Sequence, residues 1–202
     1  MRLDITLITI LVTGAISFYT LYVDQNLLDK LILRPFRDSK EGNYYTLATS
    51  GFVHADFTHL LFNMLTLYFF GRHVDMVLGP LGFMGLYLAS ILIANLVSFQ
   101  KNKTDANYAS LGASGGTSGI VFASILFYPY SKIFFFFIPI PIPGPIYAIL
   151  YLAYSYYASK NRQDGINHDA HFYGALTGLA VAILVQPLSL IAFVQYVLGA
   201  FI

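Results

Sequence analysis

The chain has 202 residues, of which 57% are hydrophobic and only 10% are Asp, Glu, Lys or Arg. Soluble domains carry about 25% charged residues, so this chain has too few charges to cover a water-facing surface, and we expect a polytopic membrane protein. The net charge of +1 gives no reason to expect a nucleic-acid partner, and the absence of cysteine excludes a disulfide, a thiolate metal site and a cysteine nucleophile.

Apolar stretches follow one another along the whole chain, most of them long enough to cross a bilayer. The first is followed by no small-residue cleavage site, so we expect a retained helix rather than a signal peptide. The tail 187–202 is short for a span and is expected to form an interfacial helix or to extend the last span. With no appended soluble domain, the prediction is one all-α, multi-pass domain over residues 1–202, with a long first loop at 24–51. The six predicted spans are 5–23, 52–71, 77–99, 112–128, 133–158 and 169–186.

The second, fourth and sixth spans each begin with polar or small residues, in "HADFTHLLFNM", "GASGGTSG" and "NHDAHFYGALTG". Successive spans cross the membrane in opposite directions, so these three beginnings meet at one face. Unpaired polar groups are costly in hydrocarbon, and their convergence therefore predicts a functional site.

The second span contributes His59 and Asn63, which are four residues apart and share one helix face. Their imidazole and carboxamide groups can donate hydrogen bonds to an oxyanion that develops during acyl transfer. Alternatively, His59 and Asn63 are an interhelical hydrogen-bonded pair with a structural role. His54 lies farther out, and we interpret it as a structural hydrogen-bonding residue near the loop.

The fourth span contains the pattern Gly-x-Ser-Gly twice, around Ser114 and around Ser118. Four residues make about one helical turn, so both hydroxyl groups lie on the same face. Their spacing therefore does not decide which serine is the nucleophile.

The sixth span begins with His171 and continues with Gly174 and Gly178. Glycines four residues apart let two membrane helices approach closely, and Gly115 and Gly119 offer the same small face on the fourth span. Packing of the two faces would bring a serine within hydrogen-bond reach of His171, which could then act as its general base. The alternative is that both glycine pairs only pack and that His171 is a structural or pore residue.

Two residues near His171 on the sixth span, Asp169 and His168, raise the alternatives of a catalytic triad and of a metal site. Asp169 is two residues before His171, about 200° around the helix, so a Ser-His dyad is more consistent than a triad, and Asp169 is expected to cap the helix. His168 and His171 are three residues apart and could share a metal, although neither histidine cluster contains the glutamate of a His-Glu-x-x-His site.

The fifth span begins with "IFFFFIPIPIPGPIYA". Its alternating prolines exclude a regular helix there. We hypothesise that this segment and the loop 159–168 move to admit substrate and water.

Together, these motifs resemble those of the rhomboid intramembrane serine proteases, over nearly the whole chain. "GASG" is similar to the nucleophile motif, with Ser114 as the nucleophile, and "AHFYGALTG" is similar to the motif whose histidine, here His171, is the base. "HADFTHLLFNMLTLYFFG" resembles the second-helix signature, with His59 and Asn63 as oxyanion donors and His54 as the outer histidine.

The resemblance also bears on the choice of serine. The family pattern Gly-Ala-Ser-Gly-Ala/Gly matches "GASGG" at Ser114, and the distance from Ser114 to Pro129 suits a short buried helix better than the distance from Ser118. The aromatic residue that often follows the nucleophile by four positions favours Ser118, because that place then holds Phe122. We favour Ser114 as the nucleophile, with Ser118 lining the site one turn below.

The resemblance implies a six-helix bundle that hydrolyses peptide bonds in or near the membrane helices of other proteins, within the bilayer and without a cofactor. It also implies a multi-pass protein of a bacterial-type inner membrane. Two alternatives remain at this stage: a non-catalytic rhomboid-like protein that binds membrane helices, and a small transporter or channel that uses the intramembrane histidines.

Overall fold

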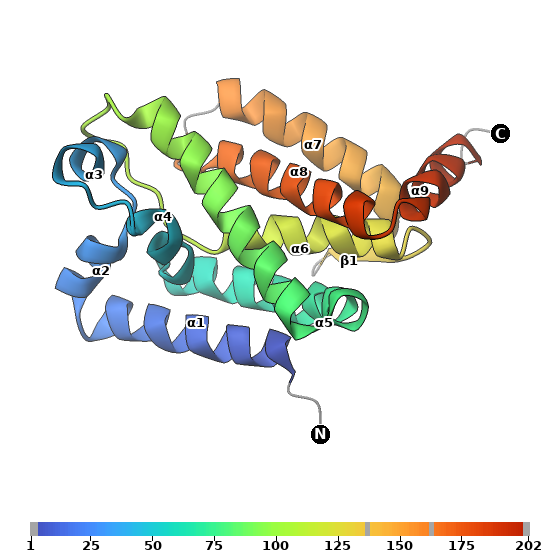
Figure 1. The fold of residues 1–202 in the computed structure, drawn as a ribbon, viewed down its shortest axis with the longest axis horizontal. Coiled ribbons are helices and arrows are strands. Elements are labelled where there is room, and N and C mark those ends of the chain that lie inside the picture. The colour runs from blue at the N-terminus through green and yellow to red at the C-terminus, as the bar shows by residue number, and fades with distance from the viewer. Residues whose placement is uncertain (1–3, 136–137, 162–163, 200–202) are drawn as a thin grey trace.

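The computed structural model describes residues 4–135, 138–161 and 164–199. Within this part, helices dominate and one small antiparallel hairpin connects two of them (Figure 1). The elements in chain order are α1 (Ile5–Tyr22), α2 (Gln25–Leu31), α3 (Pro35–Glu41), α4 (Thr46–Thr49), the 3-10 helix η1 (Ser50–Phe52), α5 (Phe57–Asn102), α6 (Ser114–Phe127), β1 (Lys132–Phe135), β2 (Ile138–Pro143), α7 (Gly144–Asn161), α8 (His168–Val185) and α9 (Leu188–Gly199).

Helix α6 is the central helix of the bundle. Every residue from Gly115 to Phe127 is buried, because α5 and α8 pack along the helix and α7 covers part of it. The helix begins just after Gly112, whose positive φ of 118° stops a helix from continuing backward through it. It ends before Pro129, which disfavours helical geometry in the preceding residue.

Three helices of the described part are long and apolar enough to cross a membrane, namely α1, α5 and α8. Helix α5 contains the predicted second and third spans, which meet at a sharp bend. Gly79 has φ 70° and ψ 173° at this bend, and Pro80 begins the second arm. Only glycine adopts such a conformation readily, and the missing N–H of proline is tolerated at the start of a helix. The bundle of long apolar helices is that of an integral membrane protein.

The segment 24–51, predicted as a long loop, folds into the short helices α2, α3 and α4 and the start of η1. The carboxylate of Asp38 holds them together from a fully buried position. It accepts hydrogen bonds from the Arg34 amide and the Thr46 hydroxyl, each at 2.8 Å, and pairs with Arg37 at 3.0 Å. A buried charge needs such partners, and here they make a compact cap over one end of the bundle.

The predicted fifth span 133–158 is wrong at its beginning, where the chain forms a hairpin and α7 starts only at Gly144. In the hairpin, Ile133 pairs with Ile142 and Lys132 pairs with Pro143. Proline lacks the amide N–H that a helix needs but is tolerated on an edge strand. The prolines therefore exclude a regular helix, as predicted, and are compatible with β2, which pairs on one side with β1.

The last predicted span agrees closely with α8. After Pro187 the tail forms the separate helix α9, which agrees with the expectation of a short terminal helix.

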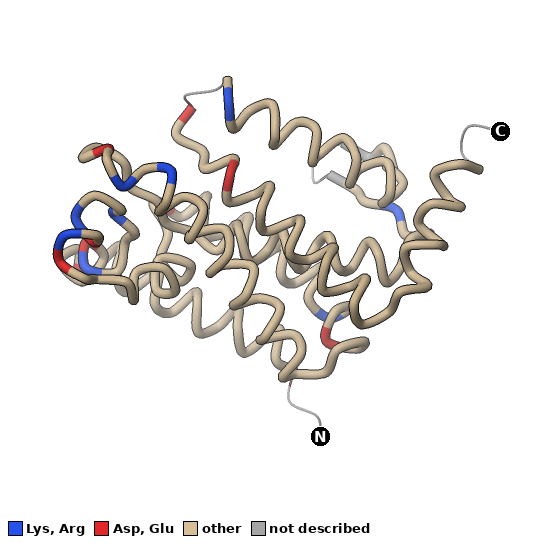
Figure 2. The backbone as a smooth tube through the Cα atoms, turned by 45° about the horizontal axis from the view of Figure 1, so that its top comes forward, with Lys and Arg blue, Asp and Glu red and all other residues tan. Residues whose placement is uncertain are grey.

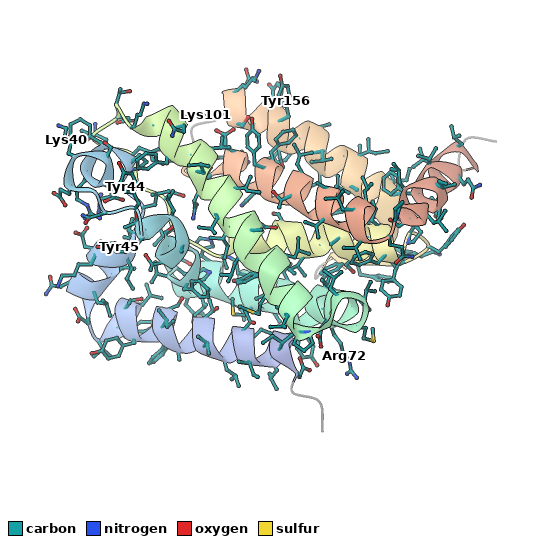
Figure 3. All side chains as sticks on the ribbon, in the orientation of Figure 1. Lys40, Tyr44, Tyr45, Arg72, Lys101 and Tyr156 are labelled. Carbon is teal, nitrogen blue, oxygen red and sulfur yellow. The ribbon has the colours of Figure 1, made fainter. Side chains whose placement is uncertain are left out.

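Figure 2 shows that charged residues gather near the ends and bends of the helices and leave their middles almost bare. At the end of the bundle where α1 finishes lie Lys40, Tyr44 and Tyr45, and Arg72 lies toward the other end (Figure 3). Tyrosines of this kind are common at the membrane–water interface.

Candidate active site

A cavity of about 750 Å³ opens at the N-terminal end of α6. The first turns of α5 and α6, the middle of α7, the loop before α8 and the first turn of α8 all contribute to its wall. The described part of the β1–β2 hairpin does not line it, but Tyr147, near the end of the proline-rich segment 133–148, does. The hypothesis that this segment moves to admit substrate and water stays a prediction. The loop 159–168 does reach the cavity, through Gly165, Ile166 and Asn167. Five of the predicted site residues line the cavity: His59, Asn63, Ser114, Ser118 and His171.

Ser114 is the first residue of α6 and is half-buried at the cavity wall. The preceding residue, Ala113, provides no side-chain cap, and the amide of Ser114 donates none of the hydrogen bonds found among the described residues, as is usual in the first turn of a helix. The His59 ring lies against Gly112, where an added Cβ would overlap it. Glycine at 112 is therefore required both by the positive φ and by the ring of His59.

Ser118 lies one turn deeper and is only 6% exposed. Its Oγ lies 3.1 Å from the phenolic oxygen of Tyr151 on α7. The two serines therefore differ in their surroundings: the hydroxyl of Ser118 is hydrogen-bonded, whereas the hydroxyl of Ser114 makes no hydrogen bond with the described residues.

His171 is in the first turn of α8, where its ring stacks on Tyr151 with ring centroids 6.3 Å apart and an interplanar angle of 27°. The ring of His168 meets it edge-on at 6.1 Å. Ser114 and His171 line the same cavity, but the hydrogen bonds of the described residues do not include one between their side chains.

The glycine faces pack as predicted. A Cβ added at Gly174 would overlap the carbonyl oxygen of Gly115, and one added at Gly178 would overlap that of Gly119. Contact of this kind between two backbones is what small residues permit in membrane helices. It fixes the start of α8 against the start of α6.

Asn63 connects α5 to α6. Its Nδ2 donates to the His59 carbonyl oxygen at 3.0 Å, and its Oδ1 accepts from the Thr117 hydroxyl at 3.1 Å. A carboxamide has two N–H donors, so one remains for another acceptor. The bond from Thr117 joins α6 to α5 and therefore agrees with the interhelical structural alternative for Asn63, whereas the described hydrogen bonds include none between the side chains of His59 and Asn63.

His54 is fully buried below the loop that leads to Ser114. The Ser17 hydroxyl donates to the Phe52 carbonyl, so it accepts from Nδ1 of His54 at 2.7 Å, and Nε2 accepts from the Ala113 amide at 3.2 Å. Burial lowers the pKa of His54 to about 3, which keeps the ring neutral. These contacts agree with the predicted structural role.

Asp169 of α8 and Asp164 of the loop before it both have partners other than His171. Asp169 forms an ion pair with Lys101 at 2.6 Å, and Asn167 caps α8 by accepting from the Ala170 amide at 3.0 Å, so the predicted cap by Asp169 is wrong. His168 contacts Asp164 at 3.1 Å. The described residues include no group of three or more His, Asp or Glu side chains that could hold a metal.

Sequence reasoning missed Tyr151 and Thr117, both of which line the cavity. Tyr147 and Tyr151 are four residues apart, and this spacing on one helix face is the signal that could have pointed to them. Because tyrosine is abundant in this part of α7, the spacing of these two residues does not distinguish them from the other tyrosines.

Comparison with known proteins gives a consistent result. The family model described as the rhomboid domain matches residues 41–188. The chain is 31% identical over 134 residues to "Rhomboid protein 1, mitochondrial" of Saccharomyces cerevisiae, covering 64% of this chain and 38% of that protein. It is 28% identical over 151 residues to "RHOMBOID-like protein 12, mitochondrial" of Arabidopsis thaliana, covering 67% of this chain and 45% of that protein. It is 31% identical over 151 residues to "Rhomboid-like protein 11, chloroplastic" of the same plant, covering 71% of this chain and 53% of that protein.

The match thus spans about half or less of the length of these relatives. Their names place them in mitochondria or chloroplasts, so they do not support the expected bacterial-type inner membrane. A family model that covers most of the chain, together with the predicted motifs, is sufficient to assign the family: the chain belongs to the rhomboid family.

Proposed function

We propose that the protein is an intramembrane serine endopeptidase that cleaves transmembrane segments of membrane proteins. The observation that carries the proposal is the cavity at the start of α6, whose wall contains the serine that begins this helix and an imidazole from the first turn of α8. In this arrangement α1, the two arms of α5, α6, α7 and α8 make six crossings, and the cavity lies below one membrane surface.

Ser114 is the proposed nucleophile. It lies at the uncapped helix terminus, whereas the hydroxyl of Ser118 is already engaged with Tyr151 one turn deeper. In the proposed reaction, Ser114 Oγ attacks the carbonyl carbon of the scissile bond while His171 accepts the hydroxyl proton. Catalytic hydrogen bonds are often absent before substrate binds and form in the complex, so a side-chain rotation of Ser114 toward His171 is part of the proposal.

The oxyanion of the tetrahedral intermediate needs donors that are already in place. The Ser114 amide, the free N–H of Asn63 and the ring of His59 supply them in this proposal. Collapse of the intermediate breaks the C–N bond, and His171 returns the proton to the leaving amine. Water then hydrolyses the ester on Ser114, with His171 again acting as the base.

The decisive experiment is reaction of the membrane-reconstituted protein with a fluorophosphonate probe, followed by mapping of the labelled peptide, alongside cleavage of a transmembrane substrate. We expect label on Ser114, no label and no cleavage in Ser114→Ala, and measurable activity in Ser118→Ala. Absence of labelling and cleavage in the wild-type protein would favour a non-catalytic membrane-helix-binding protein instead, and proton or ion flux in liposomes would favour a transporter or channel.

A further inference from the structure

The side chain of Asn167 connects three segments of the chain beside the cavity. Asn167 directly precedes α8 and lines the cavity wall. Its Oδ1 accepts a hydrogen bond from the Ala170 amide at 3.0 Å. Its Nδ2 donates to the hydroxyl of Ser98 on α5 at 2.9 Å and to the hydroxyl of Ser110, in the loop before α6, at 2.8 Å. Both N–H groups of the carboxamide are thus used, each toward a different segment.

We propose that Asn167 is a positioning residue, whose two N–H groups set the place of His171 relative to Ser114. This inference rests on the proposed function and adds to it a residue outside the groups that react. It also gives the carboxamide a role beyond capping α8, since a helix cap needs only the side-chain oxygen.

The first argument concerns the places of the two bonded residues in the chain. Asn167 lies four residues before His171, whose amide donates to the Asn167 carbonyl oxygen at 3.3 Å. Ser110 likewise lies four residues before Ser114. The bond between the side chains of Asn167 and Ser110 therefore joins the segment that leads into the proposed base to the segment that leads into the proposed nucleophile.

The second argument concerns how firmly the partners of Asn167 are held. Ser110 is 7% exposed and pairs with Leu33 in an antiparallel bridge, through backbone hydrogen bonds of 2.9 and 3.1 Å. Ser98 is fully buried, and its hydroxyl donates to the Ala94 carbonyl oxygen at 3.1 Å, so it accepts from Asn167. Two fixed acceptors leave the carboxamide, and the backbone that carries it, little freedom to move.

The third argument concerns what the glycine contacts leave open. The glycines of α8 lie after His171 along the helix, where they contact α6, whereas Asn167 lies before it. Contacts on one side of His171 alone would let the start of α8 tilt about them. The bonds of Asn167 supply a second fixed point on the other side. Such a point matters for the chemical step, because a misplacement of about 1 Å can cost about 10²-fold in rate.

The test separates the N–H groups of the carboxamide from its capping oxygen. Asn167→Ser keeps an oxygen that can cap a helix but has no group that reaches both hydroxyls, and Ser110→Ala removes one acceptor from the other side. The variant that combines both substitutions completes a double-mutant cycle. Asn107→Ser is the matched control, because Asn107 is exposed in the same loop as Ser110, does not line the cavity and has a carboxamide without a hydrogen bond to the described residues.

Each variant is reconstituted in liposomes and compared with the wild-type protein. The measured quantities are kcat and KM for a transmembrane substrate and the rate of fluorophosphonate labelling, normalised to the folded fraction from thermal unfolding. This normalisation separates a loss of folded protein from a loss in the chemical step.

We expect Asn167→Ser to lower kcat and the labelling rate by about 10- to 100-fold, with KM changed by less than about 3-fold, because misplacement of a reacting group acts on the chemical step. Ser110→Ala should lower both rates by less, about 3- to 10-fold, since the bond between Asn167 and Ser98 remains. The double variant should lie within about 2-fold of Asn167→Ser, because the bond that Ser110→Ala removes is already absent. Asn107→Ser should equal wild type.

Three results would overturn the inference and leave the proposed function intact. They are wild-type kcat in folded Asn167→Ser, a rise in its KM without a fall in kcat, which would make Asn167 a substrate-binding residue, and a loss in the double variant equal to the product of the two single losses. Should Asn167→Ser fail to fold, wild-type kcat in Ser110→Ala would overturn the inference. Absence of labelling and cleavage in the wild-type protein and in Asn107→Ser would overturn the proposed function and this inference with it.

Discussion

Two faces of α6 differ sharply in how they are packed. Toward α8, Gly115 and Gly119 meet Gly174 and Gly178 so closely that a Cβ added at Gly174 or Gly178 would overlap a carbonyl oxygen of α6. Toward α7 and the start of α5, Ser114 and other polar residues of the helix line a cavity of about 750 Å³. One face excludes everything except backbone, and the other leaves room for water and a peptide.

This difference in packing between the two faces explains how a small membrane protein can contain an open, polar site. Membrane helices gain no hydrophobic driving force from associating, so close backbone packing has to hold them. The glycine face supplies that packing and sets the distance between the two helices that carry Ser114 and His171. The polar face can then remain open, because the helix does not depend on it for its position.

The largest expected effect comes from altering the polar face. Asn63→Ala removes a proposed oxyanion donor, so kcat should fall by about 10²-fold or more, measured by cleavage of a transmembrane substrate in liposomes. Thr66→Ala is the control, because Thr66 also lines the cavity but donates only to the Phe62 carbonyl of its own helix, at 2.8 Å. Equal activity of the two variants would remove Asn63 from the proposed mechanism.

A substitution on the glycine face should act on stability. In Gly178→Ala the added methyl group meets the Gly119 carbonyl oxygen, so α8 must shift, at a cost of about 1–3 kcal/mol in unfolding free energy. Thermal unfolding in detergent measures this. Gly85→Ala is the control, because nothing lies within 4 Å of the added Cβ at Gly85. If both variants melt like the wild type, the contact between α6 and α8 is looser than described.

A third prediction concerns His54, which supports the loop at the junction of the two faces. Its pKa is about 3 in the folded protein and 6.5 in the unfolded chain, so the unfolded chain binds a proton that the folded protein does not. Stability should therefore fall as the pH drops below 6.5, by roughly 2 kcal/mol near pH 5 from this group. Thermal unfolding at several pH values should show a weaker pH dependence in His54→Gln than in the wild type; an identical dependence would show that other groups cause it.

The smallest effect is expected at Asp169, which lies outside the cavity lining and pairs with Lys101 of α5. Its ion pair with Lys101 is partly exposed, with 47% of the lysine side chain accessible, and such pairs contribute about 0–1 kcal/mol. Asp169→Asn should therefore keep cleavage activity within about 2-fold of wild type, whereas loss of the acid of a catalytic triad costs about 10⁴-fold. A large loss of kcat would indicate that Asp169 acts as the acid of a Ser-His-Asp triad.

Much of this arrangement could be predicted from the sequence. The glycine pairs, the polar starts of the even-numbered spans and the grouping of His59, Asn63, Ser114 and His171 all follow from helical spacing and membrane crossing. The hairpin could not be predicted as a hairpin, because the prolines exclude a helix without specifying a strand partner. The folded segment 24–51 contains the buried carboxylate of Asp38, and its bonds to Arg34, Arg37 and Thr46 follow no regular helical or strand spacing from which they could be predicted.

By itself, the sequence determined that the chain is a helical membrane protein and which polar side chains converge at one end of it. The periodicity of apolar residues and the length of each span are local properties, because every helix that crosses the hydrocarbon core of the membrane has to meet the same requirements by itself. Only the tertiary structure decided that the rings of Tyr151 and His171 are neighbours, that Ser118 is hydrogen-bonded to Tyr151, and that Asp169 pairs with Lys101. Those contacts join helices distant in sequence, and their partners depend on how α7 and α8 pack around α6.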